Sequence, residues 1–118
     1  MPRDEPQVHF TWRRWIIYQQ RHLVASHIFG NMSFTVYFLE SRQDTQRHYI
    51  GFTENIKKRI IQHNQGLVTS TKKFRPWKII YLEIYPNKAD ALGRERFLKS
   101  GSGWKFLQKQ LFHHFSTQ

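Results

Sequence analysis

Glu95 is the residue of this sequence that first suggests a chemical role, because its neighbours on a helix are apolar. On a helix over residues 89–99, Glu95 falls on the same arc as Leu92 and Leu98. A carboxylate in an apolar stripe is costly unless it pairs with a positive side chain or binds a cation. The side chains available for an ion pair are Arg59, Arg94 and Lys99. A metal site is the alternative.

Two further polar residues share a helix with apolar ones. In the segment that follows Thr53, Ile56 and Ile60 have the spacing of residues that face a sheet. Arg59 and His63 are one helical turn apart and fall on the flank of that buried face. A guanidinium and an imidazole at this position can bind an anion and accept a proton.

Two tyrosines occur in neighbouring strand-like segments. Tyr37 and Tyr49 each adjoin β-branched residues, and a tyrosine in a strand is most often a core residue with a hydrogen-bonded hydroxyl. Gly51 lies inside the second segment, which indicates a bulge or a close backbone approach.

The elements that position these residues begin near Met32. Residues 34–39 and 48–52 predict two antiparallel strands, joined by a polar hairpin loop. Thr53 can cap a helix that ends at about Gln65, before Gly66.

The second half of the chain predicts one more strand and two helices. A basic loop over 67–76 leads to a strand over 77–85. A helix over 89–99, capped by Asn87, comes next. A chain break at 100–103 separates it from a last helix over 104–112. The break favours a linker, with phosphate binding at the start of the last helix as the alternative. The order β-β-α-β-α-α predicts an α+β fold with a small three-stranded antiparallel sheet flanked by helices.

Residues 1–31 differ in character from the rest of the chain. They end in a turn signal, Phe29-Gly30-Asn31, and Met32 follows it directly. One interpretation is a dispensable extension before a functional domain over 32–118. The alternative is an extra N-terminal helix around residues 12–28.

The charge of the chain favours a nucleic-acid partner. Nineteen Lys and Arg against eight Asp and Glu give +11 at pH 7, and neutralised phosphates release condensed counterions. Acidic membranes and a merely basic soluble surface are the alternatives. The absence of cysteine excludes disulfides, thiolate zinc sites and cysteine nucleophiles. No apolar run approaches the ~20 residues of a membrane span, and the start lacks signal-peptide features. We therefore expect a soluble cytoplasmic protein.

The motifs together resemble those of the GIY-YIG nuclease superfamily. The family's motifs occur in the expected order as Thr35-Val36-Tyr37, Tyr49-Ile50-Gly51 and Arg59. The similarity extends over residues 33–112. The first triplet reads TVY instead of GIY but keeps its tyrosine. The stretch ADALGRERFLKSGSGWKFL is similar to small stand-alone bacterial members, which are related to the catalytic domain of the incision subunit of excision repair. The fold that the resemblance implies agrees with the element order above.

The resemblance implies a metal-dependent endonuclease that hydrolyses phosphodiester bonds in DNA. By their match to the family's positions, Glu95 is expected to bind Mg²⁺ or Mn²⁺ and Arg59 to contact the scissile phosphate. Tyr37 and Tyr49 match the signature tyrosines, and His63 matches a position that His or Tyr occupies. Any of these three residues could take the proton of the attacking water. We favour a tyrosine as the base, with His63 orienting it.

The remaining expectations concern DNA and other partners. The residues expected to contact the DNA backbone are Lys57, Lys58, Lys72, Lys73, Arg75 and Lys78. A catalytically inactive nucleic-acid-binding module, and a nuclease subunit that needs a protein partner for targeting, are the alternatives. The family's members act in DNA repair, restriction and mobile elements, and the sequence does not choose among these.

Overall fold

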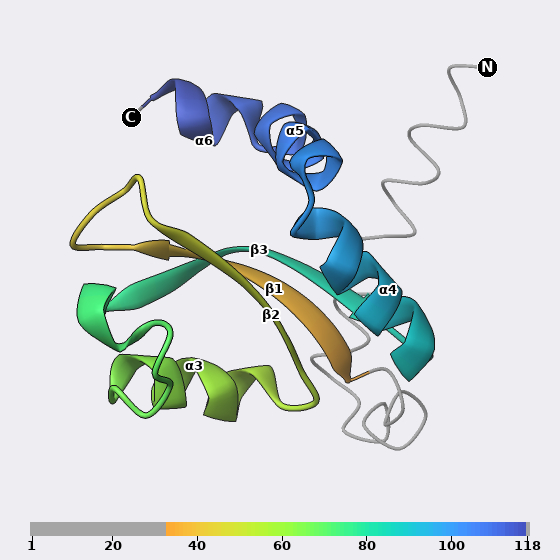
Figure 1. Cartoon of the computed structure of the whole chain (residues 1–118), viewed down its shortest axis with the longest axis horizontal. Helices are drawn as coiled ribbons and strands as arrows, with labels where there is room; N and C mark the ends of the chain where they lie inside the picture. Colours follow the sequence, from red (N-terminus) through yellow and green to blue (C-terminus); the bar gives the residue numbers. More distant parts are fainter. Residues whose placement is uncertain (1–32, 118) are drawn as a thin grey trace, which may run out of the picture. The chain divides into compact units, whose positions relative to one another are not determined.

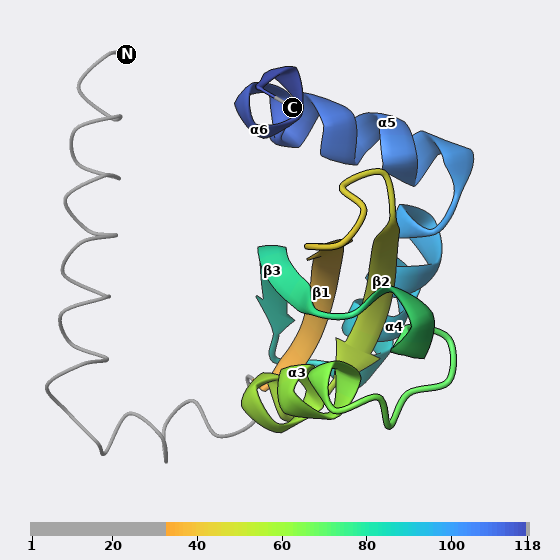
Figure 2. The ribbon, with the colours of Figure 1, turned by 90° about the vertical axis from the view of Figure 1, so that its left-hand side faces the viewer.

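The computed structural model describes residues 33–117. These residues form a three-stranded antiparallel sheet with α3 on one face and α4 and α5 on the other, as Figures 1 and 2 show. The predicted α+β class and the order β-β-α-β-α-α are confirmed. The predictions for residues 1–31 lie outside the described residues and stay predictions.

The sheet is built around its first strand. β1 (Phe34–Ser41) lies between β2 (His48–Thr53) and β3 (Trp77–Tyr85). All of β1 after Phe34 is buried, because helices cover both faces and strands cover both edges. The pairing of β1 with β3 shifts register between Phe38 and Leu39, which leaves one extra residue on β3. The β-branched and aromatic composition of these segments suits such a half-buried pleated surface.

The helices follow the strands in short connections. They are α3 (Ile56–Asn64), the 3₁₀ turn η1 (Lys72–Phe74), α4 (Lys88–Leu98), α5 (Gly101–Gln110) and α6 (Phe112–Ser116). Within residues 33–117, each helix is too short or too polar to cross a membrane.

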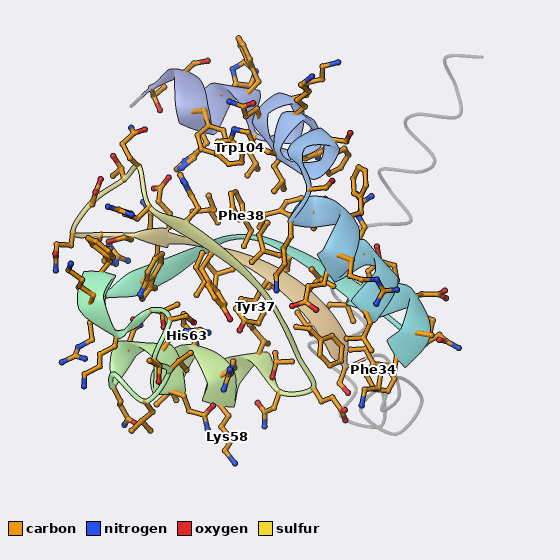
Figure 3. The ribbon with its side chains drawn as sticks, in the orientation of Figure 1. Phe34, Tyr37, Phe38, Lys58, His63 and Trp104 are labelled. Carbon is orange, nitrogen blue, oxygen red and sulfur yellow. The ribbon has the colours of Figure 1, made fainter. Side chains whose placement is uncertain are left out.

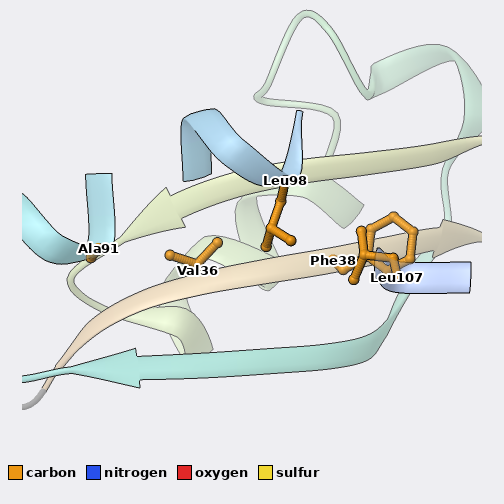
Figure 4. Close-up of a cluster of buried hydrophobic side chains, with 5 residues drawn as sticks. All are labelled: Val36, Phe38, Ala91, Leu98 and Leu107. Atoms are coloured by element: carbon orange, nitrogen blue, oxygen red, sulfur yellow. The ribbon is translucent and has the colours of Figure 1, made fainter. Parts of the chain in front are cut away.

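Each face of the sheet has its own hydrophobic core. On the α4 side, five buried residues make up the larger cluster, shown in Figure 4: Val36, Phe38, Ala91, Leu98 and Leu107. On the α3 side, Tyr37, Leu39 and Trp77 form the smaller cluster, against which Ile56 and Ile60 pack. The alternation of side chains along β1 supplies both cores. Burial of one large apolar side chain stabilises the fold by roughly 1.5–3 kcal/mol.

The predicted helix caps are right for α4 and wrong for α3. Asn87 accepts hydrogen bonds from the backbone N–H groups of Ala89 and Asp90, as expected. The cap of α3 is Asn55, whose side chain accepts from the N–H of Lys58. Thr53 instead stabilises the preceding turn, since its hydroxyl accepts from the N–H of Asn55. Both residues favour caps, and the backbone turn decides between them.

The chain breaks between α4 and α5 as predicted, but the break falls at Lys99 and Ser100, and α5 begins three residues earlier than expected. Ser100 caps α5 by accepting a hydrogen bond from the N–H of Gly103, so the glycines lie inside the first turn of the helix. A Cβ atom at Gly103 would overlap the backbone of Phe97 and Leu98 in α4. Gly103 is therefore required for the close packing of α5 on the end of α4, and its presence does not end the helix.

Replacing Gly103 should destabilise the domain, whereas the same change two residues earlier should not. We expect Gly103→Ala to lower the free energy of unfolding by about 1–3 kcal/mol, because backbone must move to accept the methyl group. Gly101→Ala is the matched control, since nothing lies within 4 Å of its added Cβ. It should leave stability unchanged or raise it by up to about 1 kcal/mol. Urea denaturation measures both, and equal stabilities would contradict this packing argument.

Candidate active site

Tyr37 is the buried centre of the candidate site. It lies in the middle of β1 on the α3 side of the sheet, with 1% of its surface exposed. Its hydroxyl is 2.8 Å from Nε2 of His63, a residue of α3 that is fully buried. Figure 3 shows the two side chains directed toward one another between the sheet and α3. A phenol thus meets an imidazole out of contact with bulk water.

Gly51 provides the space that the Tyr37 phenol occupies. The two residues are paired across β1 and β2. A Cβ atom at Gly51 would overlap the hydroxyl and ring of Tyr37 and come within 2.9 Å of the Tyr49 ring. The close approach expected from a glycine in a strand is therefore observed, in a regular register without a bulge.

The Tyr49 ring completes an aromatic group around His63. The ring centroid of His63 is 5.1 Å from that of Tyr49 and 5.6 Å from that of Tyr37, both in edge-on arrangements. The two tyrosine rings are 6.2 Å apart. These contacts fix the orientation of the imidazole by packing.

A hollow of about 320 Å³ lies between β2 and the junction of α4 with α5. Its lining includes Phe38, Lys99 and Trp104 as well as Tyr49. Since Phe38 belongs to the α4-side core and Tyr37 to the α3-side core, the hollow and the phenol lie on opposite faces of the sheet.

Thr71 contacts the other nitrogen of His63, and no motif or spacing in the sequence indicates this contact. Its hydroxyl is 2.6 Å from Nδ1 of His63, and the residue is fully buried although it belongs to the polar loop before β3. Trp77 fastens the loop, since its indole N–H donates to the Thr71 carbonyl at 2.8 Å. The spacing of the loop residues carries no periodic signal that could have identified this contact.

Arg59 lies one turn before His63 on α3, as predicted. Its guanidinium donates to the side chain of Gln62 at 3.1 Å. Its positive charge lies close enough to Tyr37 to oppose the rise in the pKa of the phenol that burial causes.

Burial dominates the acid–base properties of the pair. The pKa of Tyr37 is raised, above all by burial of the phenol, against the opposing influence of Arg59. The pKa of His63 is lowered to about 4, first by burial and then by the positive charge of Arg59. At neutral pH the site therefore holds a neutral phenol beside a neutral imidazole, and the proton of their hydrogen bond stays on one of the two without separating charge.

Glu95 approaches the same phenol from the other layer of the domain. The residue belongs to α4, and its negative charge raises the pKa of Tyr37. The carboxylate therefore lies within electrostatic range of the phenol that His63 contacts. Its side chain is 18% exposed and pairs with Lys99 at 3.1 Å, one of the three ion pairs that the sequence allowed. Arg94 pairs with Glu83 instead, at 2.8 Å.

The donor set around Glu95 suits a hard divalent cation that keeps its water. Within residues 33–117, no group of three or more His, Cys, Asp or Glu side chains is arranged to hold a metal ion. Mg²⁺ is commonly held by only one or two carboxylates, with water in the remaining positions. A single, partly exposed carboxylate fits this kind of site and does not fit a structural zinc site.

The basic residues expected at DNA fall into two groups. Five are exposed near the α3 side: Lys57, Lys58, Lys72, Lys73 and Arg75. Lys78 differs, because its ammonium group is 3.6 Å from the buried carboxylate of Glu40. Glu40 also lies 2.8 Å from Nε2 of His114 in α6, on the opposite face of the sheet from Tyr37. The position of Lys78 has a structural explanation, whereas the other five are available to a ligand.

Comparison with known proteins identifies a family. Residues 33–106 match the model described as the GIY-YIG catalytic domain. A UPF0213 protein of Staphylococcus saprophyticus is 41% identical over 61 residues, covering 51% of this chain and 74% of the relative. A UPF0213 protein of Syntrophus aciditrophicus is 39% identical over 75 residues, covering 62% and 84%. A third, of Clostridium perfringens, is 37% identical over 65 residues, covering 54% and 68%. No solved structure gives a significant match.

The contact between Gly51 and Tyr37 can be tested by a double-mutant cycle. Gly51→Ala should lower the free energy of unfolding by about 1–3 kcal/mol, because the new methyl group overlaps the phenol. In a Tyr37→Leu background, which lacks the ring and its hydroxyl, the same change should cost at least about 1 kcal/mol less. Chemical denaturation of the four proteins gives the coupling energy. A coupling near zero would mean that the overlap is relieved elsewhere.

The lowered pKa of His63 should appear as a pH dependence of stability. The folded value of about 4 lies below the ordinary value of 6.5, so between these values the unfolded chain binds more protons. The contribution of the neutral imidazole is complete above pH 6.5 and is lost as the pH falls toward 4.

The control for this pH dependence is the variant His63→Gln, which has all the titrating groups of the wild-type protein except His63. From pH 7 to pH 4, the wild-type protein should lose roughly 3 kcal/mol more free energy of unfolding than this variant. Parallel curves for the two proteins would show that His63 titrates normally in the folded state.

Proposed function

The chain belongs to the family of GIY-YIG catalytic domains, and from this membership we propose that it is a metal-dependent endonuclease that hydrolyses phosphodiester bonds in DNA. The observation that carries the proposal is the buried hydrogen bond between the Tyr37 phenol and His63, with Arg59 and Glu95 close enough for their charges to act on the phenol. These groups come from β1, α3 and α4. A domain that only bound nucleic acid would not need them to meet beside a buried hydroxyl.

Arg59 is proposed to bind the scissile phosphate. A guanidinium presents paired N–H donors that match two phosphate oxygens, and it stabilises the negative charge that grows on them in the transition state. The donation to Gln62 limits the freedom of the side chain. Less conformational entropy is then lost when the phosphate arrives.

Glu95 is proposed to hold Mg²⁺ or Mn²⁺ with water in the remaining positions. The bound cation supplies Lewis-acid polarisation of the phosphate and stabilises the leaving oxygen. The contribution of the chain is one carboxylate whose position α4 fixes. Lys99 pairs with this carboxylate in the absence of a cation.

Tyr37 is proposed to act as the general base, with His63 as its proton acceptor. The oxygen of the attacking water forms a bond to phosphorus, and the bond from phosphorus to the leaving oxygen breaks. The proton of the water passes to the Tyr37 oxygen as the phenolic proton passes to Nε2 of His63, 2.8 Å away. A phosphate against Arg59 offsets the positive charge that lowers the pKa of His63, so the imidazole becomes a better acceptor when substrate is bound.

The exposed basic residues of the α3 side are proposed to position the DNA backbone. Contacts of this kind are electrostatic and independent of base sequence, so binding should weaken steeply with salt. Lys78 makes a smaller contribution in this proposal, because its ammonium group already pairs with Glu40.

A binding module without catalytic activity is the second candidate. The ion pair between Glu95 and Lys99 favours it, since one carboxylate oxygen is already engaged at 3.1 Å. A nuclease subunit that needs a protein partner for targeting is a further form of the main proposal, and it predicts weak activity of the isolated chain.

Isosteric variants can separate these candidates. Duplex, branched and single-stranded DNA are incubated with the protein, with and without Mg²⁺ or Mn²⁺. Glu95→Gln and Arg59→Lys should each lower the cleavage rate at least about 100-fold, because each removes an interaction with charge that develops in the transition state. Circular dichroism should show that both variants keep the fold.

The controls use the same chemical changes away from the site. Glu54→Gln removes an exposed carboxylate that pairs with Lys88 at 3.3 Å, and Arg96→Lys changes an exposed guanidinium of α4. Both should cleave like the wild-type protein. Salt-sensitive binding without product under any metal would support the binding module. Equal cleavage by Glu95→Gln and wild type would contradict the assigned role of Glu95.

A further inference from the structure

The buried hydroxyl of Thr71 has no role in the function proposed above. It lies 2.6 Å from Nδ1 of His63, on the side of the ring away from Tyr37. A buried hydroxyl must both donate and accept hydrogen bonds if it is not to destabilise the fold. Which group donates and which accepts between Tyr37, His63 and Thr71 therefore determines where the proton of the His63 ring lies.

Only one assignment of donors and acceptors along Tyr37, His63, Thr71 and Val68 gives every proton an acceptor. The Thr71 hydroxyl can donate to the carbonyl of Val68 at 3.4 Å and accept from Nδ1–H of His63. Nε2 of His63 is then an acceptor, and it accepts from the phenolic O–H of Tyr37. The positive charge of Arg59 acts on the same phenol. Each proton has an acceptor in this arrangement.

The reverse direction leaves the proton of Tyr37 without a partner among these groups. If Thr71 donated to Nδ1, the neutral imidazole would carry its proton on Nε2 and donate it to the phenolic oxygen. Arg59 is a donor only, so it could not accept the phenolic proton. The phenol is 1% exposed, and an unsatisfied buried hydroxyl costs about 1–3 kcal/mol.

We propose that Thr71 is a positioning residue that keeps His63 in the Nδ1–H tautomer, so that Nε2 remains free to accept the phenolic proton of Tyr37. This inference rests on the proposed nuclease function for its catalytic consequence. The choice of tautomer is a property of the folded chain alone. In the Nε2–H tautomer the imidazole would donate to the phenol, and the proton could not leave Tyr37 by this route.

The surroundings of Thr71 suit a fixed contact. The carbonyl of Thr71 accepts from the indole N–H of Trp77, and its N–H donates to the Val68 carbonyl at 3.1 Å. Asn64, the neighbour of His63 on α3, exchanges two hydrogen bonds with the backbone of Trp77, at 2.6 and 3.1 Å. The loop that carries Thr71 is thus held to the helix that carries His63.

Nitrogen NMR of the full chain, with ¹⁵N-labelled histidine, tests the tautomer directly. The signals of His63 are assigned by their loss in His63→Gln. At pH 7 the wild-type protein should show a protonated Nδ1 and an unprotonated Nε2. Thr71→Val has nearly the same shape but no hydroxyl, and it should shift the ring toward the Nε2–H form. Thr71→Ser keeps the hydroxyl and should restore the Nδ1–H form.

Cleavage rates test the catalytic consequence. Thr71→Val should lower the rate at least about tenfold, part of the 10²- to 10⁴-fold that proton transfer commonly contributes, and Thr71→Ser should recover most of the loss. Circular dichroism and the Tm show whether each variant is folded. A valine variant that keeps the Nδ1–H form would overturn the proposal. A changed tautomer with an unchanged rate would overturn its catalytic part.

The two proposals fail in distinguishable ways. A wild-type protein that cleaves no DNA under any condition would remove the nuclease function. The NMR comparison would still decide whether Thr71 sets the tautomer. If Thr71→Val does not fold, the wild-type and Thr71→Ser spectra decide the tautomer alone, and an Nε2–H form in either protein would overturn the inference.

Discussion

The hydrogen bond between the Tyr37 phenol and His63 is the constraint on which the rest of the site depends. Both groups are almost fully out of contact with solvent, so each must find its partner within the protein. The absence of a side chain at Gly51 makes room for the phenol, and the loop through Thr71 supplies the second contact of the imidazole. Burial also sets the pKa of both groups in the direction of the neutral form. The two groups therefore form a neutral pair joined by one short hydrogen bond.

The sheet brings together side chains that no single element could present. β1 contributes the phenol, and α3, which packs on the same face, contributes the imidazole and the guanidinium. α4 packs on the other face and contributes the carboxylate, whose charge still reaches the phenol. Arg59 and Glu95 act on the pKa of Tyr37 in opposite directions. The balance of charge at the phenol is therefore sensitive to whatever binds either residue.

The sequence predicted those parts of the structure that follow a period or a motif. The three strands, the helices α3 and α4 and the cap at Asn87 follow from patterning, and the grouping of Tyr37 with His63 follows from the triplets around the two tyrosines. Thr71 could not be predicted, because its contact depends on how an irregular loop folds back onto α3. The start of α5 at Gly101, three residues before the predicted start, could not be predicted for a related reason. Glycine is unfavourable inside a helix and usually marks its end. Gly103 nevertheless lies inside α5, because α5 packs so closely on α4 that a larger residue would overlap the α4 backbone.

The position of β1 has a consequence for the persistence of the site. The strand is paired on both edges and packed on both faces, and it is buried from Thr35 to Ser41. Segments of this kind open only at a cost close to the free energy of unfolding of the whole domain, whereas loops and chain ends open far more easily. Tyr37 is thus carried by the portion of the fold that fluctuates least. The position of Tyr37 relative to β2 and β3 is therefore kept until the whole domain unfolds cooperatively.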